Sequence, residues 1–405
     1  MPQRAATIES LPMAFEVVKE MQAGGLDWGE GYRPLGRRAL AEIVEGRMAE
    51  AVDRWLDGLD GSAVRDRRNG SYRRCLLSEL GDIELAVPRT RRFCPTGVLR
   101  SYARRAPEID RAILAGFVLG LSTRKVGEVL LTLLGRPVSA STVSRVARTL
   151  DTAVAAFHRR PLKNAYKALM LDGVVLARKT GAGALRRPVL VALGIRPDGR
   201  KEIVDYRLAT AESAAEWERF LTGLYRRGLT GEGLETICVD GGQGLLAALP
   251  VVYHGIPVQR CWAHKMRNIL DKVRKADRDA VKADAHAVMN ADNRRKAESA
   301  ARRFADRWEP VYPKAVACLR NDPSAGSGQA LDELLTCFRY KTLAERKQVR
   351  TTNAIERRFR EVRRRTRPMG TFQDRTSMDR ILFAIFTHEN KRQGIATPFP
   401  LTHNI

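Results

Sequence analysis

Long apolar runs are missing from this sequence. The longest, Ala112 to Leu121, has about half the length needed to cross a bilayer. The N-terminal segment contains Glu9 and Glu16 and has no continuous apolar stretch followed by small residues, so it lacks the pattern of a signal peptide. These absences argue against a membrane protein and predict a cytoplasmic one.

Paired cysteines are also missing. The six cysteines are scattered along the chain, and none of them forms a Cys-x-x-Cys pair. This spacing argues against a disulfide framework and against a zinc site made of four cysteines. It favours a reducing compartment, which agrees with a cytoplasmic protein.

Acidic residues are too few to balance the basic ones. Lys plus Arg number 71 against 46 Asp plus Glu, which gives a net charge of +25. A surplus of this size favours a polyanionic partner, because a protein that neutralises phosphates releases their condensed counterions. An anionic membrane is the alternative, but no basic helix carries an opposite face rich in Trp, Phe and Leu. We therefore predict that the partner is a nucleic acid.

Residues 1–106 are predicted to form a basic helical and hairpin region. Apolar residues recur with a period near 3.6 between Ala39 and Leu59, which predicts an amphipathic helix. A basic stretch ending in Asn69-Gly70 indicates a turn. Two strand candidates, Arg74 to Leu80 and Ile83 to Val87, complete the region.

Three helices are predicted within residues 107–160. The first ends at Gly120, and the second runs from Ser122 to Gly135. The third starts near Ser139 or Ser141 and carries one apolar stripe from Val143 to Phe157.

The last two helices have the outline of a helix-turn-helix, because Gly135-Arg136-Pro137-Val138 joins them. In such a motif the second helix enters the DNA major groove. The residues that we expect to contact DNA from its polar side are Ser141, Thr142 and Arg145. An ordinary three-helix bundle with polar outer faces is the alternative.

From Ala165 onward the pattern changes to that of an α/β domain. The predicted strands are 168–177, 189–195, 202–208, 236–239 and 257–261. The first three are expected to form an antiparallel meander, because Pro197-Asp198-Gly199 is a turn signal. Ser213 and Glu216 have capping-box spacing and open a helix between the third and fourth strands. This order is typical of a ribonuclease-H-like fold.

The interval between Asp240 and Glu356 is too long for a loop. We predict that residues 265–350 are a helical insertion, and that residues 161–264 and 351–390 form the α/β domain around it. Pro323 to Gln329 is a low-complexity stretch and is predicted to be a flexible linker.

Two aspartates stand out in the predicted strands. Asp172 interrupts the apolar stretch Leu169 to Leu176, where a buried charge needs a donor, a basic side chain or a metal. The alternative is that Asp172-Gly173 forms a turn between two short strands. Asp240 ends a strand and precedes two glycines, a place that is open to ligands. Its alternative role is to cap the next helix.

Glu356 begins an arginine-rich helix after Thr351-Thr352-Asn353-Ala354-Ile355. The spacing of Asn353 and Glu356 is that of a capping box, which would give the carboxylate a purely structural role. However, arginines continue along the same helix face, as phosphate chemistry would require. A solvated basic helix is the alternative explanation for them. The arginines that we expect to contact DNA are Arg360, Arg363, Arg364 and Arg367.

The three acids together suit metal-assisted cleavage of a phosphodiester. In-line attack on a phosphodiester is assisted by two metal ions, one at the nucleophile and one at the leaving oxygen. Magnesium prefers hard oxygen ligands and keeps several waters, so few carboxylates suffice. We expect Asp172 to bridge two Mg²⁺ or Mn²⁺ ions, with Asp240 and Glu356 each holding one.

Several short motifs follow one another along the chain. They are Leu121-Ser122-Thr123-Arg124, Leu171-Asp172-Gly173, Val239-Asp240-Gly241-Gly242, Gln259-Arg260-Cys261-Trp262-Ala263-His264-Lys265-Met266-Arg267-Asn268, Thr351-Thr352-Asn353-Ala354-Ile355-Glu356, Arg363-Arg364-Arg365-Thr366-Arg367 and Gly370-Thr371-Phe372. Each is weak alone, but in this order they are specific. From about Tyr72 to Phe372 the chain resembles the Mutator-type family of DDE transposases of bacterial insertion sequences.

The resemblance implies a ribonuclease-H-like catalytic domain with a helical insertion before the glutamate. By position, Asp172, Asp240 and Glu356 match the catalytic, metal-binding residues of the family. Cys261 and His264 match its Cys/His motif. Two further zinc ligands are not evident, so we expect this pair to have a structural or DNA-positioning role.

The resemblance also implies partners and a reaction. The N-terminal region is expected to bind the terminal inverted repeats of the element, and the catalytic domain to act on these ends and on double-stranded target DNA. Hydrolysis frees a 3′-hydroxyl that attacks another strand, usually through a circular intermediate. We expect a homo-oligomer on DNA, because two ends must be brought together, and a location in the bacterial nucleoid.

Two stretches depart from the family pattern, and two other functions stay open. Phe338 to Leu343 lacks the proline and tryptophan that relatives often have, and the low-complexity stretch looks inserted.

The alternative functions are a nuclease of the same fold that does not join strands, and a helix-turn-helix DNA-binding protein with a vestigial catalytic domain.

Overall fold

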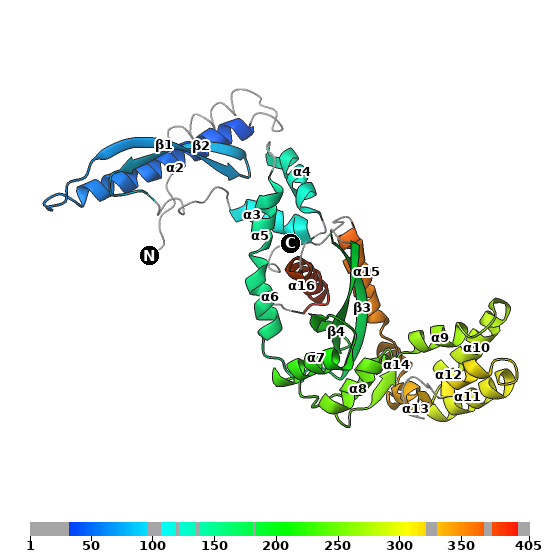
Figure 1. Ribbon diagram of the computed structural model, residues 1–405. Helices are drawn as coiled ribbons and strands as arrows, with labels where there is room; N and C mark the ends of the chain where they lie inside the picture. Colours follow the sequence, from blue (N-terminus) through cyan, green and yellow to red (C-terminus); the bar gives the residue numbers. More distant parts are fainter. Residues whose placement is uncertain are drawn as a thin grey trace. The chain divides into compact units, whose positions relative to one another are not determined.

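The structure, a computed structural model, describes residues 32–95, 107–118, 121–134, 138–180, 183–320, 330–367 and 375–395. The chain divides into two compact units, residues 1–148 and 149–405 (Figure 1). The predicted linker Pro323 to Gln329 and the motif Gly370-Thr371-Phe372 lie outside the described residues.

The first unit begins with a helix on a two-stranded hairpin. Helix α2 (Tyr32–Asp57) packs on strands β1 (Arg68–Ser78) and β2 (Gly81–Thr90), which are antiparallel. Met48 lies in their shared core with apolar residues of β2. The turn predicted at Asn69-Gly70 is wrong. These residues belong to β1, and the register shifts there because Gly70 has a φ of +68° and forms a bulge.

The described part of this unit also contains the helices α3 (Pro107–Val118), α4 (Thr123–Leu134) and α5 (Ala140–Ala147). Ile113, Val126 and Val143 lie in their common core. Helix α5 begins after Ser139, whose side chain accepts a hydrogen bond from the N–H of Thr142. Gly120 and the joining residues Gly135-Arg136-Pro137 are outside the described part of the chain.

The prediction of one continuous third helix is wrong. The helix is interrupted at Arg148 and Thr149, where ψ is −19° at both residues, closer to a 3₁₀ than to an α conformation. Helix α6 (Leu150–Arg159) then belongs to the second unit. The apolar stripe that looked continuous in the sequence therefore serves two different cores.

The second unit is built on a five-stranded mixed sheet. The strands are β3 (Ala168–Thr180), β4 (Gly183–Ile195), β5 (Lys201–Leu208), β6 (Thr236–Val239) and β7 (Val258–Arg260), in the order β5-β4-β3-β6-β7. The first three form the predicted antiparallel meander, and β6 and β7 run parallel to β3. Strand β3 is continuous through Asp172, which pairs with Val191, so the alternative of a turn at Asp172-Gly173 is wrong.

Helices flank the sheet on both sides. Helices α7 (Ala214–Arg226) and α8 (Gln243–Val252) share a core with Leu169 and Leu171 of β3. Helix α15 (Asn353–Thr366) lies along β3, and α16 (Arg375–Arg392) packs on β5 and α6 (Figure 1). Side chains alternate along a strand, so Asp172 projects to the face opposite Leu171.

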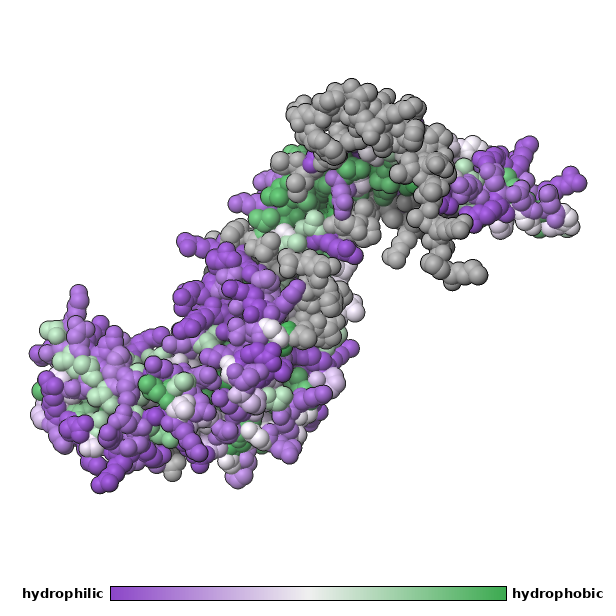
Figure 2. Space-filling model, turned by 180° about the vertical axis from the view of Figure 1, so that it is seen from behind, coloured by the Kyte–Doolittle hydropathy of each residue, from purple (hydrophilic) through white to green (hydrophobic). Residues whose placement is uncertain are grey.

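Residues 265–350, predicted as a helical insertion, are mostly helical in the described ranges, and the first helix begins slightly earlier. It contains α9 (Trp262–Leu270), α10 (Arg278–Met289), α11 (Arg294–Trp308), α12 (Pro313–Arg320) and α13 (Ala330–Leu334), followed by α14 (Leu343–Val349). Trp262, Phe304 and Trp308 contribute to a core of its own. The visible surface of the second unit is largely hydrophilic (Figure 2). In the described ranges, no helix has the length and apolar content of a membrane span.

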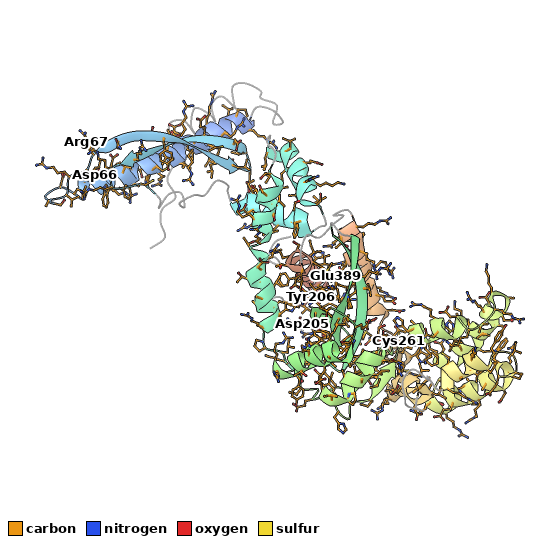
Figure 3. The ribbon with its side chains drawn as sticks, in the orientation of Figure 1. Asp66, Arg67, Asp205, Tyr206, Cys261 and Glu389 are labelled. Atoms are coloured by element: carbon orange, nitrogen blue, oxygen red, sulfur yellow. The ribbon has the colours of Figure 1, made fainter. Side chains whose placement is uncertain are left out.

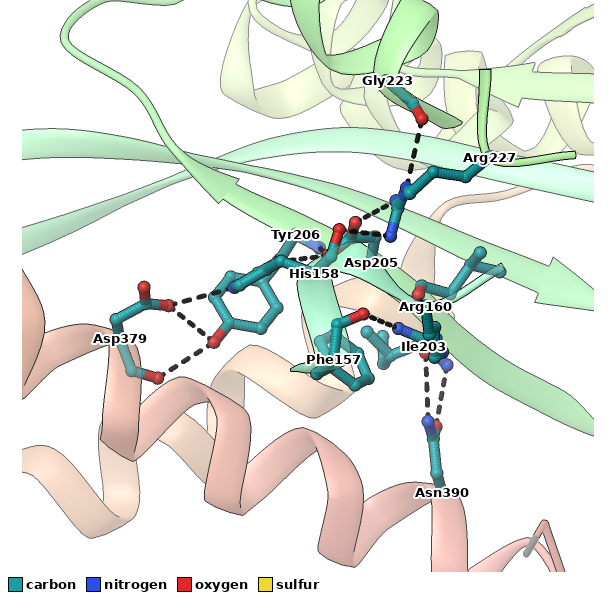
Figure 4. A network of polar contacts seen from close by, with 11 residues as sticks. Phe157, His158, Arg160, Ile203, Asp205, Tyr206, Gly223, Arg227, Asp379 and Asn390 are labelled. Carbon is teal, nitrogen blue, oxygen red and sulfur yellow. Dashed lines mark hydrogen bonds and ion pairs between the residues drawn. The ribbon is translucent and has the colours of Figure 1, made fainter. Parts of the chain in front are cut away.

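A buried polar network ties α6 and α16 to β5 (Figure 4). Nδ1 of His158 lies 2.7 Å from Oδ1 of Asp205, and its Nε2 lies 3.4 Å from Oδ1 of Asp379. Tyr206 donates its hydroxyl to Asp379 at 2.7 Å, and Arg227 pairs with Asp205. Burial disfavours the charged imidazole, but the hydrogen bonds to both aspartates outweigh it and raise the pKa of His158 to about 9.

This network predicts a pH dependence of stability. A histidine whose pKa is raised on folding stabilises the protein fully below its unfolded pKa of about 6.5, and this contribution disappears as the pH rises through about 9. His158→Gln is therefore expected to lower the free energy of unfolding at pH 6 by about 3 kcal/mol, and by much less near pH 10. Urea unfolding at both pH values measures this, with the exposed His254→Gln as the control. An equal loss at both pH values would contradict the assignment.

Candidate active site

Asp172 is a nearly buried carboxylate in the middle of β3. The residue is 3% exposed, and among the described residues its Oδ2 has no hydrogen-bond partner. Burial and the charge of Asp240 raise the pKa of Asp172 to about 7, although the charge of His264 and a hydrogen bond to Thr352 oppose the rise. An oxygen buried without a partner is costly, so this carboxylate is prepared for a cation or a donor from outside.

Asp240 follows β6 directly. The N–H of Gly242 donates to its Oδ1 at 3.0 Å. The N-cap of α8 is Gly242 and makes no side-chain capping bond, so the alternative role of Asp240 as a helix cap is wrong. The loop turns at Gly241, which has a φ of +101°.

Glu356 lies in the first turn of α15. The helix begins one residue earlier than predicted, after Thr352, and no side chain caps it. The predicted capping box of Asn353 and Glu356 is therefore wrong. Instead, Oε1 of Glu356 lies 3.6 Å from Nε2 of His264 and 3.8 Å from Nη2 of Arg267.

Some of the predicted residues meet around a polar cavity of about 340 Å³. Asp172, His264 and Glu356 line it together with Arg360 and Arg363. Both arginines are exposed, as binding to a DNA backbone requires. Strands and helices far apart in the sequence thus bring two of the three acids and two arginines to one place, with Asp240 close enough to act on the charge of Asp172.

Other predicted DNA contacts lie elsewhere. Arg364 forms an ion pair with Glu361 at 2.6 Å, and Arg367 is exposed at the end of α15. Arg145 is exposed on α5 of the first unit. The hydroxyls of Ser141 and Thr142 both bond to that of Ser139, each at 3.0 Å, so they also take part in capping α5.

Cys261, which is labelled in Figure 3, contacts the two segments that carry Asp240 and Glu356. Its N–H donates to the carbonyl of Val239 at 2.7 Å, and its Sγ accepts from the N–H of Thr352 at 3.3 Å. It thereby touches the residue before Asp240 and the N-cap of the helix that carries Glu356.

His264 follows one helical turn later. The neighbouring Cys261 thiol raises the pKa of His264 to about 9 and outweighs the opposing effect of burial. The same contact lowers the pKa of the Cys261 thiol against the effect of burial. A positively charged imidazole between Cys261 and Glu356 restrains the carboxylate.

The donor chemistry fits a divalent cation of the magnesium type. Asp172, Asp240 and Glu356 offer hard oxygen ligands, and one oxygen of Asp172 is buried without a partner. Across the described ranges, no three His, Cys, Asp or Glu side chains are already arranged to hold a metal ion. The residues therefore suit such an ion chemically, although the carboxylates are not assembled as a closed site.

Two neighbours of Asp240 were not predicted from the sequence. Arg260 is 2% exposed, and its Nε donates to Glu333 at 2.7 Å. Its Nη1 packs so closely on Gly241 that a Cβ there would lie 2.1 Å away. Glu212, between β5 and α7, places its carboxylate over Gly173. Arg260 stands in a recognised motif, whereas no local signal marks Glu212.

Comparisons with known proteins show the family of the chain. A family model described as "Transposase, Mutator family" matches residues 12–393. The transposase for insertion sequence element IS905 of Lactococcus lactis subsp. lactis is 29% identical over 91% of this chain and 91% of its own length. The transposase for IS406 of Burkholderia multivorans is 33% identical over 79% of this chain and 81% of its own length.

Among solved structures, a chain of the Drosophila P element transposase strand transfer complex aligns with 73% of this chain and 96% of its own, at 12% identity. The TM-score is 0.33, too low for a structural argument. The sequence matches are sufficient without it, because the family match extends over nearly the whole chain. The chain therefore belongs to the Mutator family of transposases.

Proposed function

We propose that this chain is a DDE-type DNA transposase. It hydrolyses a phosphodiester at each end of an insertion sequence and joins the freed 3′-hydroxyl to target DNA. The observation that carries this proposal is the buried, partnerless oxygen of Asp172, which lies in a cavity with Glu356 and two exposed arginines and beside Asp240. The order β5-β4-β3-β6-β7, with a meander followed by two parallel strands, supports a ribonuclease-H-like catalytic domain.

Each part of the site has a role in this reaction. Asp172, Asp240 and Glu356 hold two Mg²⁺ or Mn²⁺ ions, which when bound supply activation of the nucleophile and stabilisation of the leaving oxygen. Arg360 and Arg363 bind phosphate oxygens of the DNA through charge-assisted hydrogen bonds. The sheet and α15 fix the acids, so the protein contributes mainly positioning and charge.

The partners follow from the same proposal. The first unit binds the terminal inverted repeats, with α5 and its residues Ser141, Thr142 and Arg145 in the major groove. The two relatives are named as transposases for bacterial insertion sequence elements. We propose a homo-oligomer that holds two ends of such an element together.

An assay with paired DNA ends tests the function. Purified protein is incubated with oligonucleotides that carry pre-cleaved element ends and with a supercoiled target plasmid. We expect ends covalently joined to the plasmid in the presence of Mg²⁺ or Mn²⁺. Ends that are cut but never joined would indicate a nuclease, and binding without cutting would indicate a DNA-binding protein alone.

Cys261 gives a second prediction within this function. Cys261→Ala leaves the buried N–H of Thr352 without its acceptor and loosens the start of α15, which carries Glu356. We expect the free energy of unfolding to fall by about 1–3 kcal/mol and strand joining to fall by about 10–100-fold. Cys337→Ala removes another buried cysteine and serves as the control. It should lose stability but retain joining, and equal joining in both variants would exclude the positioning role.

A further inference from the structure

The carboxylate of Glu212 lies against two glycines, Gly173 and Gly242. A Cβ on Gly173 would lie 2.4 Å from Oε1 of Glu212 and 2.9 Å from its Oε2, so the carboxylate occupies the place of a side chain on β3. Gly173 immediately follows Asp172. Only glycine at this position lets an acidic side chain from another segment approach the strand so closely.

Glu212 and Asp240 face the same point. A Cβ on Gly242 would lie 3.7 Å from Oε1 of Glu212 and 3.5 Å from Oδ1 of Asp240. The backbones that carry the two acids are also packed tightly, since a Cβ on Gly244 would lie 2.9 Å from the N atom of Ala214. The two carboxylates are therefore held near each other by the backbone.

Neither Glu212 nor Asp240 forms an ion pair with Arg, Lys or His in the described part of the chain. Asp172, the residue before Gly173, has a buried Oδ2 without a partner, and the charge of Asp240 acts on Asp172. The Trp217 indole lies close to the Glu212 carboxylate. Adjacent carboxylates that form no ion pair attract a divalent cation.

We propose that Glu212 is a fourth carboxylate of the active site, and that it binds one of the divalent cations together with Asp240. This inference rests on the proposed function. Glu212 approaches over Gly173, on the side of β3 opposite Asp172, whereas Glu356 lies on the cavity with Asp172. The acids thus approach the end of β6 from both faces of the sheet. Two carboxylates with bound water and a DNA phosphate satisfy a magnesium ion.

Binding of Mn²⁺ to the full-length protein without DNA tests the proposal. Titration followed by the electron paramagnetic resonance signal of free Mn²⁺ should show at least about tenfold weaker binding at one site in Glu212→Gln. Glutamine keeps an acceptor oxygen for Trp217 and removes only the charge. Glu218→Gln changes the same charge on the exposed side of α7 and should bind Mn²⁺ like the wild type.

Gly173→Ala provides an independent variant. Its Cβ has no room beside the Glu212 carboxylate, so it should displace Glu212 and weaken Mn²⁺ binding at the same site. Circular dichroism and the melting temperature establish that each variant is folded. Wild-type Mn²⁺ affinity in folded Glu212→Gln would overturn the proposal.

The failure of this inference is distinguishable from failure of the proposed function. Loss of Mn²⁺ binding and strand joining in Asp240→Asn, with both retained in Glu212→Gln, would show that Glu212 is not a metal ligand and would leave the proposed function intact. Retention of both in Asp240→Asn and Asp172→Asn would remove the metal-dependent function itself, and with it the role of Glu212.

Discussion

Asp172→Asn is expected to lower the rates of strand cleavage and strand joining by at least about 10³-fold, because it removes the charge at the centre of the site. The amide has nearly the shape of the carboxylate, so β3 and its pairing with β4 should persist. Binding to element ends should be unchanged or slightly tighter, since the chain becomes more positive. The measurement is joining of pre-cleaved ends at saturating protein, with DNA affinity determined separately.

The control for this variant is Asp306→Asn, an exposed aspartate of α11 in the helical insertion. It makes the same chemical change away from the cavity and should join ends at the wild-type rate. Full joining activity in folded Asp172→Asn would falsify the assignment of this residue. A parallel loss of DNA binding and joining would instead assign Asp172 to DNA recognition.

The metal-free protein should lose stability as the pH rises from about 4 to about 7. The folded state raises the pKa of Asp172 to about 7, mainly through burial, whereas an unfolded aspartate titrates near 3.9. Within this window the folded state binds the extra proton, so deprotonation favours unfolding, and above pH 7 the cost stays constant. A shift of this size corresponds to about 4 kcal/mol.

Urea unfolding of the wild type and of Asp172→Asn in the presence of a chelator isolates this contribution. The difference between the two free energies of unfolding should favour the variant at pH 8 and decrease toward zero near pH 4. Added Mg²⁺ should recover stability in the wild type at pH 8, because a ligand that binds only the folded state stabilises it. A difference that does not depend on pH would show that Asp172 is not buried in its charged form.

Local pattern was sufficient for most elements of the α/β unit. Apolar runs between turn signals located the strands of the meander, and Ser213 was identified as the start of α7, where its side chain accepts from the N–H of Glu216. Local pattern was insufficient where one sequence pattern is compatible with two different local structures. Asn69-Gly70 forms a bulge rather than a turn, and the apolar stripe from Val143 to Phe157 is divided between two units.

The acidic residues of the site show the same difference between local sequence pattern and contacts in space. Asp172 and Asp240 stand out in the sequence itself. A charged residue is unusual within an apolar strand, and it is also unusual at the end of such a strand before two glycines. Glu212 has no such signal, since an acid before a helix is ordinary. It becomes notable only through Gly173 and Gly242, which lie beside it in space and far from it in the chain.

The order of strands and helices, the excess of positive charge and the three acids can be read from the amino-acid sequence, because periodicity, turn residues and isolated charges are local properties. Three other features follow from the folded chain alone: β3 continues through Asp172, Cys261 contacts the N-cap of α15, and Glu212 lies over Gly173. These are contacts between distant segments. Their register depends on how whole strands and helices pack, which no short stretch of sequence specifies.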